Sequence, residues 1–295
     1  MIRELVDQRL RAVMVLPEFR AALTELAEQD EEAALIQPEV HSFLQTLYLR
    51  LGGTDARSVQ PFVGAWVLLR ATISRLDHVQ DGDTDETQLQ ADSSVASQYN
   101  AALAYYVLST ALLDELETKS IPAARLFRLR RLWADNLLCA ASGQQRDLGY
   151  AKLGGVEHSG LEHYQQAAEA KSGTVFALAV GGVAALASDD ALVIQACRCI
   201  GHVYGTLLQF SDDLLDASQQ TRAVLTLPQI YTTTRGVDPM ASRQELSIFW
   251  RQYIYPAYLT QVEQALKELP HTARTDVLQL FAVTFGQPHV DGVAT

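Results

Sequence analysis

The sequence predicts an all-α fold, and three observations support this prediction. Proline is sparse, with 9 residues in 295, so few positions would interrupt a helix. Residues that favour helices, such as Ala, Leu, Glu and Gln, are frequent along most of the chain. The alternation of polar and apolar residues that is typical of half-buried strands is nearly absent. Since 48% of the residues are hydrophobic, the chain can also bury a large core.

Helical periodicity and turn residues divide the chain into ten expected helices, several of them longer than the ~3 turns of an average helix. The expected helices span residues 2–14, 18–28, 31–51, 60–80, 95–118, 121–142, 160–187, 190–217, 241–267 and 271–284. Breaks are expected at Gly52–Gly53, at Pro122 and after Ala187, where Ser188 or Asp189 could cap the next helix. Helices of this length suit a bundle around a deep cavity.

Charge and cysteine content restrict the partners and the compartment. A net charge of -12 disfavours a nucleic-acid backbone or an anionic membrane surface as the main partner. The three cysteines, Cys139, Cys197 and Cys199, are odd in number and lie in apolar helical segments, so we expect reduced thiols in the cytoplasm. The N-terminus alternates charged and apolar residues and does not resemble a signal peptide. The longest apolar stretch, 174–187, is shorter than the ~20 residues that cross a bilayer. It predicts a buried helix and no stable membrane insertion.

Three carboxylates gather at the end of the expected helix 190–217. Asp212 and Asp216 are four residues apart and therefore share a helix face, with Asp213 beside them. Carboxylates crowded on an apolar helix repel one another and lose hydration, so a bound cation would stabilise them. An acidic helix face exposed to solvent is the alternative interpretation.

A second pair of carboxylates, Asp77 and Asp81, lies at the end of the expected helix 60–80. Mg²⁺ usually takes one or two protein carboxylates together with water and substrate phosphate oxygens. Two such clusters facing each other across a cavity could therefore hold a diphosphate through shared Mg²⁺ ions. A calcium loop that begins at Asp81 is an alternative, but its sixth position would be Glu86, where the sharp turn needs Gly.

Around these clusters, from about residue 50 to residue 230, the sequence resembles the trans-isoprenyl diphosphate synthase (polyprenyl synthetase) family. LQFSDDLLD at 208–216 is similar to the second aspartate-rich motif of that family, FQxxDDxxD. GQQRDL at 143–148 is similar to its GQxxDL segment, KSG at 171–173 to its KT(G) element, and LTLP at 225–228 to its TLP. The resemblance implies a single all-helical domain over residues 1–295, an isoprenoid synthase-type bundle of about ten to twelve helices. It also implies a homodimer.

The resemblance further implies a Mg²⁺-dependent reaction of an allylic prenyl diphosphate. Ionisation of such a substrate breaks an allylic C–O bond, so the leaving diphosphate must be neutralised while an apolar pocket excludes water. Residues 62–69 and 174–187 are expected to line this pocket, with ordinary core packing as the alternative. The implied metal ligands are Asp77, Asp81, Asp212 and Asp216. The implied catalytic residues are these four together with Asp213 and Lys171. The implied diphosphate-binding residues are Lys171, Gln144 and Gln209.

The sequence departs from the family pattern at two places. The first motif, DDxxD in the family, reads DHVQD here, so His78 replaces one carboxylate, and we expect no ligand role for it. The basic residues that bind isopentenyl diphosphate in the family are mostly missing. Arg57 and Arg70 could replace them, because a guanidinium suits multi-oxygen anions. Thr72 and Ile73, just before Asp77, are not large aromatic residues that would close the pocket early.

These departures leave three functional hypotheses. In the first, the protein is a prenyltransferase that adds isopentenyl units to an allylic diphosphate. In the second, it is a terpene synthase, cyclase or coupling enzyme that ionises a prenyl diphosphate without isopentenyl diphosphate. In the third, it is a non-catalytic subunit of a heteromeric synthase. The intact second cluster and Lys171 argue against the third, since no structural need explains three buried carboxylates.

Overall fold

The computed structural model describes residues 2–11, 13, 15–32, 38–81, 95–152, 161–215 and 248–285. Throughout these ranges the regular secondary structure consists of helices, and no strand occurs in them. The all-α prediction is therefore confirmed. One contiguous hydrophobic core includes residues from Val6 near the N-terminus to Phe281 near the C-terminus. The assignment of all 295 residues to a single domain stays a prediction for the segments outside the described ranges.

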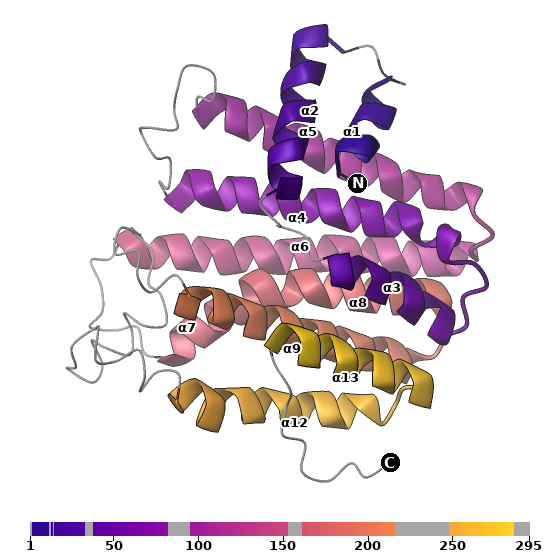
Figure 1. Cartoon of the computed structure of the whole chain (residues 1–295), viewed down its shortest axis with the longest axis vertical. Coiled ribbons are helices and arrows are strands. Elements are labelled where there is room, and N and C mark those ends of the chain that lie inside the picture. The colour runs from indigo at the N-terminus through magenta and orange to yellow at the C-terminus, as the bar shows by residue number, and fades with distance from the viewer. Residues whose placement is uncertain are drawn as a thin grey trace.

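Long helices lie side by side with nearly aligned axes and form the body of the molecule (Figure 1). They are α4 (Gln60–Asp81), α5 (Val95–Asp114), α6 (Ala123–Lys152), α8 (Thr174–Ala187), α9 (Ala191–Leu215) and α12 (Tyr255–Leu266). The other α-helices are α1 (Ile2–Arg11), α2 (Pro17–Glu32), α3 (Pro38–Arg50), α7 (Leu161–Ala168) and α13 (His271–Phe285). Short turns of 3₁₀ or π helix connect some of them: η1 (Ala56–Ser58), η2 (Glu115–Thr118), η3 (Glu169–Gly173) and η5 (Trp250–Ile254).

Helix α8 is the centre of the bundle, and each of its residues from Val175 to Ala187 is buried. It packs against α3, α4, α6 and α9, so that no face of it is left for solvent. A helix that is apolar all round is expected in such a position. The prediction of a buried helix at 174–187 is therefore confirmed.

Two helical runs, Leu161–Ala187 and Ala191–Leu214, are long and apolar enough to cross a membrane by length and composition alone. The apolar stretch 174–187 is part of the first run, because α7 and η3 continue into α8 without interruption, as expected for a helix at 160–187. In the most apolar part of the two runs, 78% and 61% of the residues are buried inside the bundle, as in core helices of soluble proteins. The absence of stable membrane insertion stays a prediction.

Several expected boundaries need correction. The helix expected at 121–142 continues to Lys152, so the GQQRDL segment is helical. The helix expected at 31–51 begins at Pro38, a residue favoured in the first turn, while α2 extends to Glu32. Asp190, instead of Ser188 or Asp189, caps α9, because its carboxylate accepts a hydrogen bond from the Leu192 backbone N–H at 2.8 Å. The first part of the expected helix 241–267 lies outside the described residues.

Candidate active site

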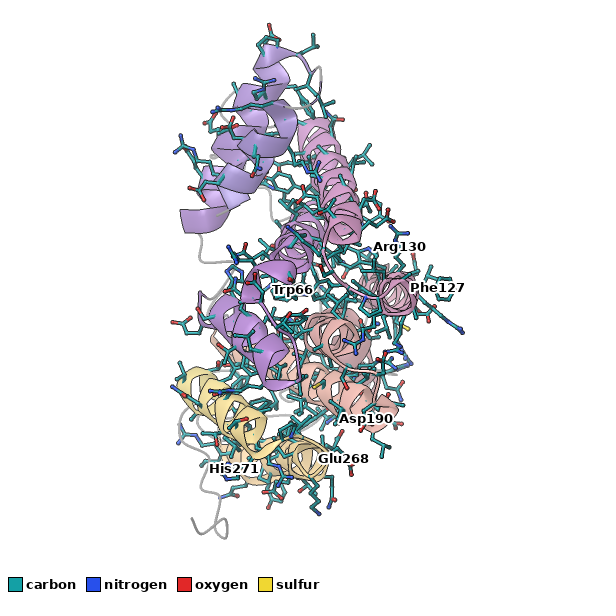
Figure 2. The ribbon with its side chains drawn as sticks, turned by 90° about the vertical axis from the view of Figure 1, so that its right-hand side faces the viewer. Trp66, Phe127, Arg130, Asp190, Glu268 and His271 are labelled. Atoms are coloured by element: carbon teal, nitrogen blue, oxygen red, sulfur yellow. The ribbon has the colours of Figure 1, made fainter. Side chains whose placement is uncertain are left out.

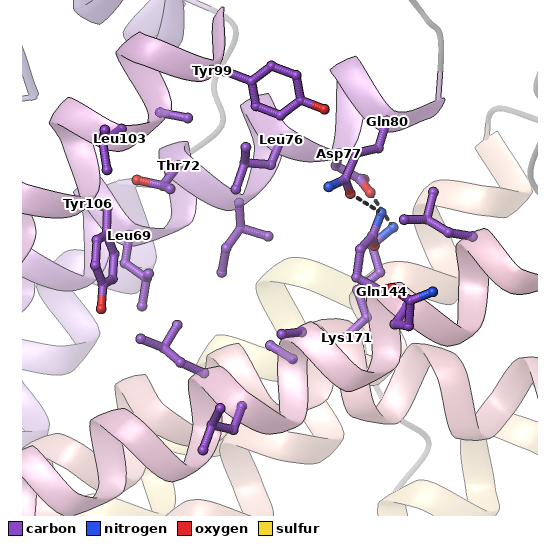
Figure 3. Close-up of a pocket in the computed structure, with 18 residues that line it drawn as sticks. Leu69, Thr72, Leu76, Asp77, Gln80, Tyr99, Leu103, Tyr106, Gln144 and Lys171 are labelled. Atoms are coloured by element: carbon purple, nitrogen blue, oxygen red, sulfur yellow. Dashed lines mark hydrogen bonds and ion pairs between the residues drawn. The ribbon is translucent and has the colours of Figure 1, made fainter.

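A cavity of about 640 Å³ lies between α4, α5 and α6 (Figure 3). Its walls are mainly apolar and include Leu69 and Leu76 of α4 and Leu103 of α5. Polar residues gather at one end, where Asp77 and Lys171 meet close to Gln80 and Gln144. Burial of apolar surface favours an apolar ligand in such a cavity, whereas the polar end can hold a charged group. The cavity therefore suits a ligand with a charged head and a long apolar tail.

The predicted lining of the pocket is corrected by the structure. Of residues 62–69, only Leu69 lines the cavity, and none of residues 174–187 does. Both segments contribute to the core instead, since α8 is enclosed by its neighbours. Thr72 and Ile73 do line the cavity, as their positions just before Asp77 suggested.

Lys171 connects three helical elements at the polar end of the cavity. Its ammonium Nζ lies 2.6 Å from Asp77 Oδ1 on α4 and 3.2 Å from Asp147 Oδ2 on α6. Burial raises the pKa of Asp147, while the charge of Lys171 opposes this shift and that of Asp77 adds to it. Two carboxylates share a single ammonium, so an incoming diphosphate needs additional cations. Hard cations with oxygen ligands, such as Mg²⁺, fit this group of side chains.

The backbone around Lys171 adopts a π turn, η3, which is inserted between α7 and α8. Such π turns inside α-helical runs are frequent at functional sites. Gly143 of α6 packs directly on it, because a Cβ at Gly143 would lie only 2.6 Å from the Lys171 backbone nitrogen. This close approach leaves no room for a side chain at position 143 and so explains why a glycine stands there. Asp147 follows four residues later on the same helix face and therefore reaches Lys171.

Asp213 of the second aspartate cluster is turned into the protein. It is 5% exposed, and its Oδ2 accepts a hydrogen bond of 2.5 Å from the Tyr164 hydroxyl. Its Oδ1 accepts one of 3.0 Å from Gln209 Nε2, and Gln209 Oε1 in turn accepts one of 2.6 Å from the Ser172 hydroxyl. Burial, together with the charge of Asp213, raises the pKa of Tyr164 well above its usual value, so the phenol stays a donor.

Asp212, the preceding residue, is exposed. Successive residues of a helix point about 100° apart, so the two neighbours face different surroundings. Asp213 is held by protein donors, while Asp212 is exposed on a different side of α9. Asp213 was not among the implied metal ligands, and its geometry suits a residue that fixes the end of α9.

Two of the four implied metal ligands fall outside what the structure describes. Asp81 ends α4, but its side chain, like that of His78, is outside the described part, and so is the whole of Asp216. The same holds for residues 225–228 and for the segment of the alternative calcium loop. Within the described ranges, no group of three or more His, Cys, Asp or Glu side chains is assembled for a metal. The complete Mg²⁺ site therefore stays a prediction.

Gln144 bridges α6 and α4 at the polar end of the cavity. Its Nε2 donates a hydrogen bond of 3.0 Å to Gln80 Oε1. Its Oε1 is buried and, among the described residues, has no hydrogen-bond donor. Diphosphate oxygens only accept hydrogen bonds, whereas water bound to a metal ion donates them. The unpartnered oxygen therefore suits hydrated Mg²⁺ at this end of the cavity better than a direct contact with diphosphate.

Arg70 of α4 is a buried cation that lies over an aromatic ring. Its guanidinium carbon lies 5.0 Å from the centre of the Phe176 ring, and its Nη1, which is closed to solvent, has no partner in the described part of the chain. Burial lowers the pKa of Arg70, and the negative charge of Asp212 opposes that shift. A buried charge of this kind is costly unless an anion accompanies it. The surroundings of Arg70 therefore favour an anionic ligand.

His41 of α3 shares this region. Its Nε2 is also buried and has no hydrogen-bond partner among the described residues. Burial lowers the pKa of His41 to about 4, and the charge of Arg70 contributes to the shift. The imidazole is therefore neutral at pH 7 and can donate a hydrogen bond without adding charge.

Arg57, which was expected to act with Arg70, lies elsewhere. It is exposed and forms an ion pair with Asp55, with Nη2 2.9 Å from Oδ2. It also precedes α4, whereas Arg70 is ten residues into that helix, which corresponds to a rise of about 15 Å. The structure does not assemble the two arginines into one site and places His41 near Arg70 instead.

Sequence reasoning assigned no role to three residues of these sites. Asp147 stood inside a quoted motif, and its spacing of four from Gly143 was a usable signal. Tyr164 lies seven residues, or two helical turns, before Lys171, which was a weaker signal. His41 carried no local signal, because its contact with α4 depends on tertiary packing.

Comparisons with known proteins agree with the fold and with the quoted motifs. The sequence profile described as polyprenyl synthetase matches residues 89–225. The geranylgeranyl pyrophosphate synthetase of Pyrococcus horikoshii has a TM-score of 0.73 at 18% identity, over 97% of this chain and 95% of that one. The enzyme of the same name from Geoglobus acetivorans has a TM-score of 0.74 at 17% identity, over 94% and 96% of the two chains.

A farnesyl diphosphate synthase of T. brucei, solved with a bisphosphonate, has a TM-score of 0.72 at 12% identity, over 97% and 96% of the chains. At these identities, structural similarity establishes the fold and no more. No curated protein sequence matches the chain.

The helical bundle has the fold of the solved geranylgeranyl pyrophosphate synthetases. The match of residues 89–225 to the polyprenyl synthetase profile agrees with the resemblance that the motifs predicted. In fold and in this segment, the chain is similar to the trans-isoprenyl diphosphate synthases.

Proposed function

We propose that the protein is a Mg²⁺-dependent prenyltransferase that ionises an allylic prenyl diphosphate and extends it with isopentenyl diphosphate. The observation that carries this proposal is the apolar cavity whose charged end is formed by Lys171 and Asp77. The family match over residues 89–225 and the shared fold of prenyl diphosphate synthases support it. We further propose that it acts in the cytoplasm, in keeping with its free cysteines.

In this proposal, the side chains at the charged end manage the leaving group. Asp77, Asp81, Asp212 and Asp216 would hold Mg²⁺, which when bound neutralises the negative charge on the diphosphate. Lys171 exchanges its contact with Asp77 for the diphosphate oxygens and so stabilises the charge that develops as the C–O bond breaks. Asp147 keeps Lys171 in place during this exchange.

The cavity walls hold the prenyl chain and exclude water. Water would otherwise capture the allylic cation and give an alcohol, so a dry site is needed. Tyr99 and Tyr106 line the cavity, and the faces of aromatic rings attract cations. The double bond of isopentenyl diphosphate then attacks the cation, a carbon–carbon bond forms, and loss of a proton completes the longer prenyl diphosphate.

Arg70 and His41 support the use of a second diphosphate. A buried guanidinium whose Nη1 lacks an acceptor is stabilised by an anion, and a diphosphate accepts hydrogen bonds from both residues. This arrangement replaces the expected pair of Arg57 and Arg70.

An enzyme that works without isopentenyl diphosphate, such as a terpene synthase, cyclase or coupling enzyme, is the second candidate. It is favoured by the position of Arg57, which is exposed and bound to Asp55, so that few basic groups surround a second diphosphate. A non-catalytic subunit is the third candidate, and the assembled pair of Lys171 and Asp77 argues against it.

Product analysis tests the proposal. The purified protein is incubated with Mg²⁺ and geranyl, farnesyl or geranylgeranyl diphosphate, each with and without isopentenyl diphosphate, and the products are identified by mass spectrometry. Longer diphosphates that form only with isopentenyl diphosphate would support the prenyltransferase. Hydrocarbons or alcohols formed in its absence would favour the second candidate, and no turnover with any combination would favour the third.

A further inference from the structure

Glu169, the first residue of the π turn η3, points away from the cavity. Lys171, two residues later, reaches Asp77 on α4 and Asp147 on α6. Two residues turn a helix by roughly 160–200°, so the side chains of Glu169 and Lys171 lie on opposite sides of η3. Glu169 Oε1 accepts a hydrogen bond of 2.6 Å from the hydroxyl of Tyr258 on α12. The turn that carries the ammonium is therefore also held on the side opposite the cavity.

Helix α12, which supplies Tyr258, lies at one edge of the bundle, whereas α4 and α5 lie towards the opposite edge (Figure 1 and Figure 2). Among the described residues that line the cavity, none belongs to α12. Tyr258 is 6% exposed, and its ring meets that of Phe210 edge to face, with the centroids 5.9 Å apart. Burial, together with the hydrogen bond to Glu169, raises the pKa of Tyr258, so the phenol stays a donor. Tyr258 is thus a donor fixed in place by the core.

Helix α9 supports the same turn by close packing. A Cβ at Gly205 would lie 2.5 Å from a backbone carbonyl oxygen of η3, and one at Gly173 would lie 3.0 Å from His202 Nε2. Burial lowers the pKa of His202, while the charge of Glu169 and a hydrogen bond to the Glu169 backbone oppose this shift. These contacts hold the backbone of η3. The hydrogen bond from Tyr258 holds the Glu169 side chain.

A π turn depends on such contacts, because it places one extra residue in a helical run. In η3 the backbone N–H of Thr174 bonds to the carbonyl oxygen of Glu169. If the extra residue were accommodated one position away, the residues in between would rotate by about 100°. Lys171 would then lose its place between Asp77 and Asp147. Within the described part of the chain Glu169 forms no ion pair, so no cation takes over when the phenol is removed.

We propose that Tyr258 is a positioning residue for Lys171, because its hydrogen bond to Glu169 fixes the π turn from which the ammonium reaches the charged end of the cavity. Tyr258 acts from outside the cavity and through the backbone of η3. The inference rests on the proposed function only where it concerns catalysis, since Lys171 acts there on the leaving diphosphate. The place of the ammonium between its two carboxylates can be measured without turnover.

Competitive acylation of the lysines, followed by peptide mass mapping, measures this placement. The chain has four lysines, and the side chain of Lys171 is 12% exposed and paired with two carboxylates, so its labelling should be slow in the wild-type protein. We expect Lys171 to be labelled roughly 10-fold faster in Tyr258→Phe and in Glu169→Ala, the factor for loss of one hydrogen bond to a charged group. Lys119 and Lys267 are the references within each sample.

Three control variants separate this hydrogen bond from a general loss of stability. Tyr253→Phe removes an exposed hydroxyl and should leave the labelling of Lys171 unchanged. Glu169→Gln keeps an acceptor oxygen for Tyr258, so labelling should stay within about threefold of wild type. Val262→Ala removes buried methyl groups from α12, one turn after Tyr258, and lowers stability without removing the hydrogen bond. It should also leave the labelling unchanged.

Kinetics then test whether this placement contributes to catalysis. Tyr258→Phe should lower the kcat for release of diphosphate from an allylic substrate roughly 10-fold. In the Lys171→Gln background the same substitution should have no further effect, because the residue that it positions is gone. A role of Tyr258 in stability alone would instead lower kcat by the same factor in both backgrounds.

Unchanged labelling of Lys171 in Tyr258→Phe, equally fast labelling in Val262→Ala, or equal kinetic effects in the two backgrounds would overturn the proposal. A lack of turnover in the wild-type protein would contradict the proposed function instead. The labelling would then still decide whether Tyr258 fixes the position of Lys171.

Discussion

Two buried polar regions flank the end of α9, and they differ in how their polar atoms are paired. Around Asp213, both carboxylate oxygens accept hydrogen bonds from protein donors, Tyr164 and Gln209. Around Arg70, the guanidinium Nη1 and the nearby His41 Nε2 have no partner in the described residues. A paired region is complete without a ligand, whereas an unpaired buried charge is stabilised by one. The first region is therefore suited to a structural role, and we propose that the second binds a ligand.

Lys171 lies between these two extremes, because its partners are carboxylates that a ligand can replace. The largest expected effect is that of Lys171→Gln, which removes the cation near the leaving group. We expect kcat to fall roughly 10²- to 10³-fold, as for the loss of other groups that stabilise developing charge. Release of diphosphate from an allylic substrate measures it. Lys267→Gln, at an exposed position, is the control. A kcat within twofold of wild type would contradict the role of Lys171.

His41, in the region around Arg70, allows a prediction of how the free energy of unfolding depends on pH. The folded-state pKa of His41 is about 4, below its unfolded value near 6.5, so the unfolded chain binds the proton more tightly. Stability contributed by the neutral imidazole is present above pH 6.5 and is lost as the pH falls towards 4, by up to about 3 kcal/mol.

Urea unfolding between pH 4 and pH 7 measures this loss. In His41→Gln the loss should be smaller, whereas His271→Gln, at an exposed site, should behave as the wild-type protein does. Identical pH dependence in His41→Gln and wild type would show that burial does not shift this imidazole.

Arg70→Met separates a binding role from a structural one. Replacing this buried charge by an apolar side chain is expected to leave the free energy of unfolding unchanged or to raise it. Loss of a charged hydrogen-bonding group worth about 1.5–3 kcal/mol should raise the KM for isopentenyl diphosphate about 10- to 100-fold. Steady-state kinetics and urea unfolding give the two numbers. Arg57→Met should change neither, since Arg57 is exposed. An unchanged KM in Arg70→Met would show that isopentenyl diphosphate does not bind in this region.

Substitutions of the neighbouring residues Asp213 and Asp212 test whether the region around Asp213 has a structural role. Asp213→Asn removes charge from a buried acceptor of two hydrogen bonds, so we expect a loss of about 1–3 kcal/mol in the free energy of unfolding. Asp212→Asn changes an exposed residue and should leave that stability nearly unchanged while raising the Mg²⁺ concentration needed for activity. Equal stability of the two variants would show that Asp213 is not an internal anchor.

Tyr164→Phe has the smallest expected effect. It removes one donor to Asp213 and keeps the ring that stacks on Phe210, so a loss of about 1 kcal/mol is expected. Thermal unfolding detects this difference. Tyr253→Phe, at an exposed position, provides the control. A larger change in substrate affinity than in stability would show that Tyr164 takes part in binding and is not mainly structural.

The sequence predicted the elements and the charged end of the cavity better than their surroundings. Periodicity and ordered motifs, which are local signals, predicted the long helices and singled out Asp77 and Lys171; the ion pair of these two residues with each other was not predicted. The continuation of α6 through Gly143 was not predicted either, because Gly usually weakens a helix, and here close packing against η3 outweighs that preference. The roles of Arg57 and His41 also escaped prediction. Sequence spacing does not show that Arg57 forms an ion pair with Asp55 or that His41 of α3 lies near Arg70.

The π turn at η3 contains one residue more than the α-helix would need at this point. That extra residue rotates everything before it by about 100° relative to α8, including Tyr164. Deleting a residue from 169–173 would restore a regular α-helix and turn the Tyr164 hydroxyl away from Asp213. The segment thus changes the rotation of α7 relative to α8 within one continuous helical run. Its length, as much as its composition, sets which side chains meet at the end of α9.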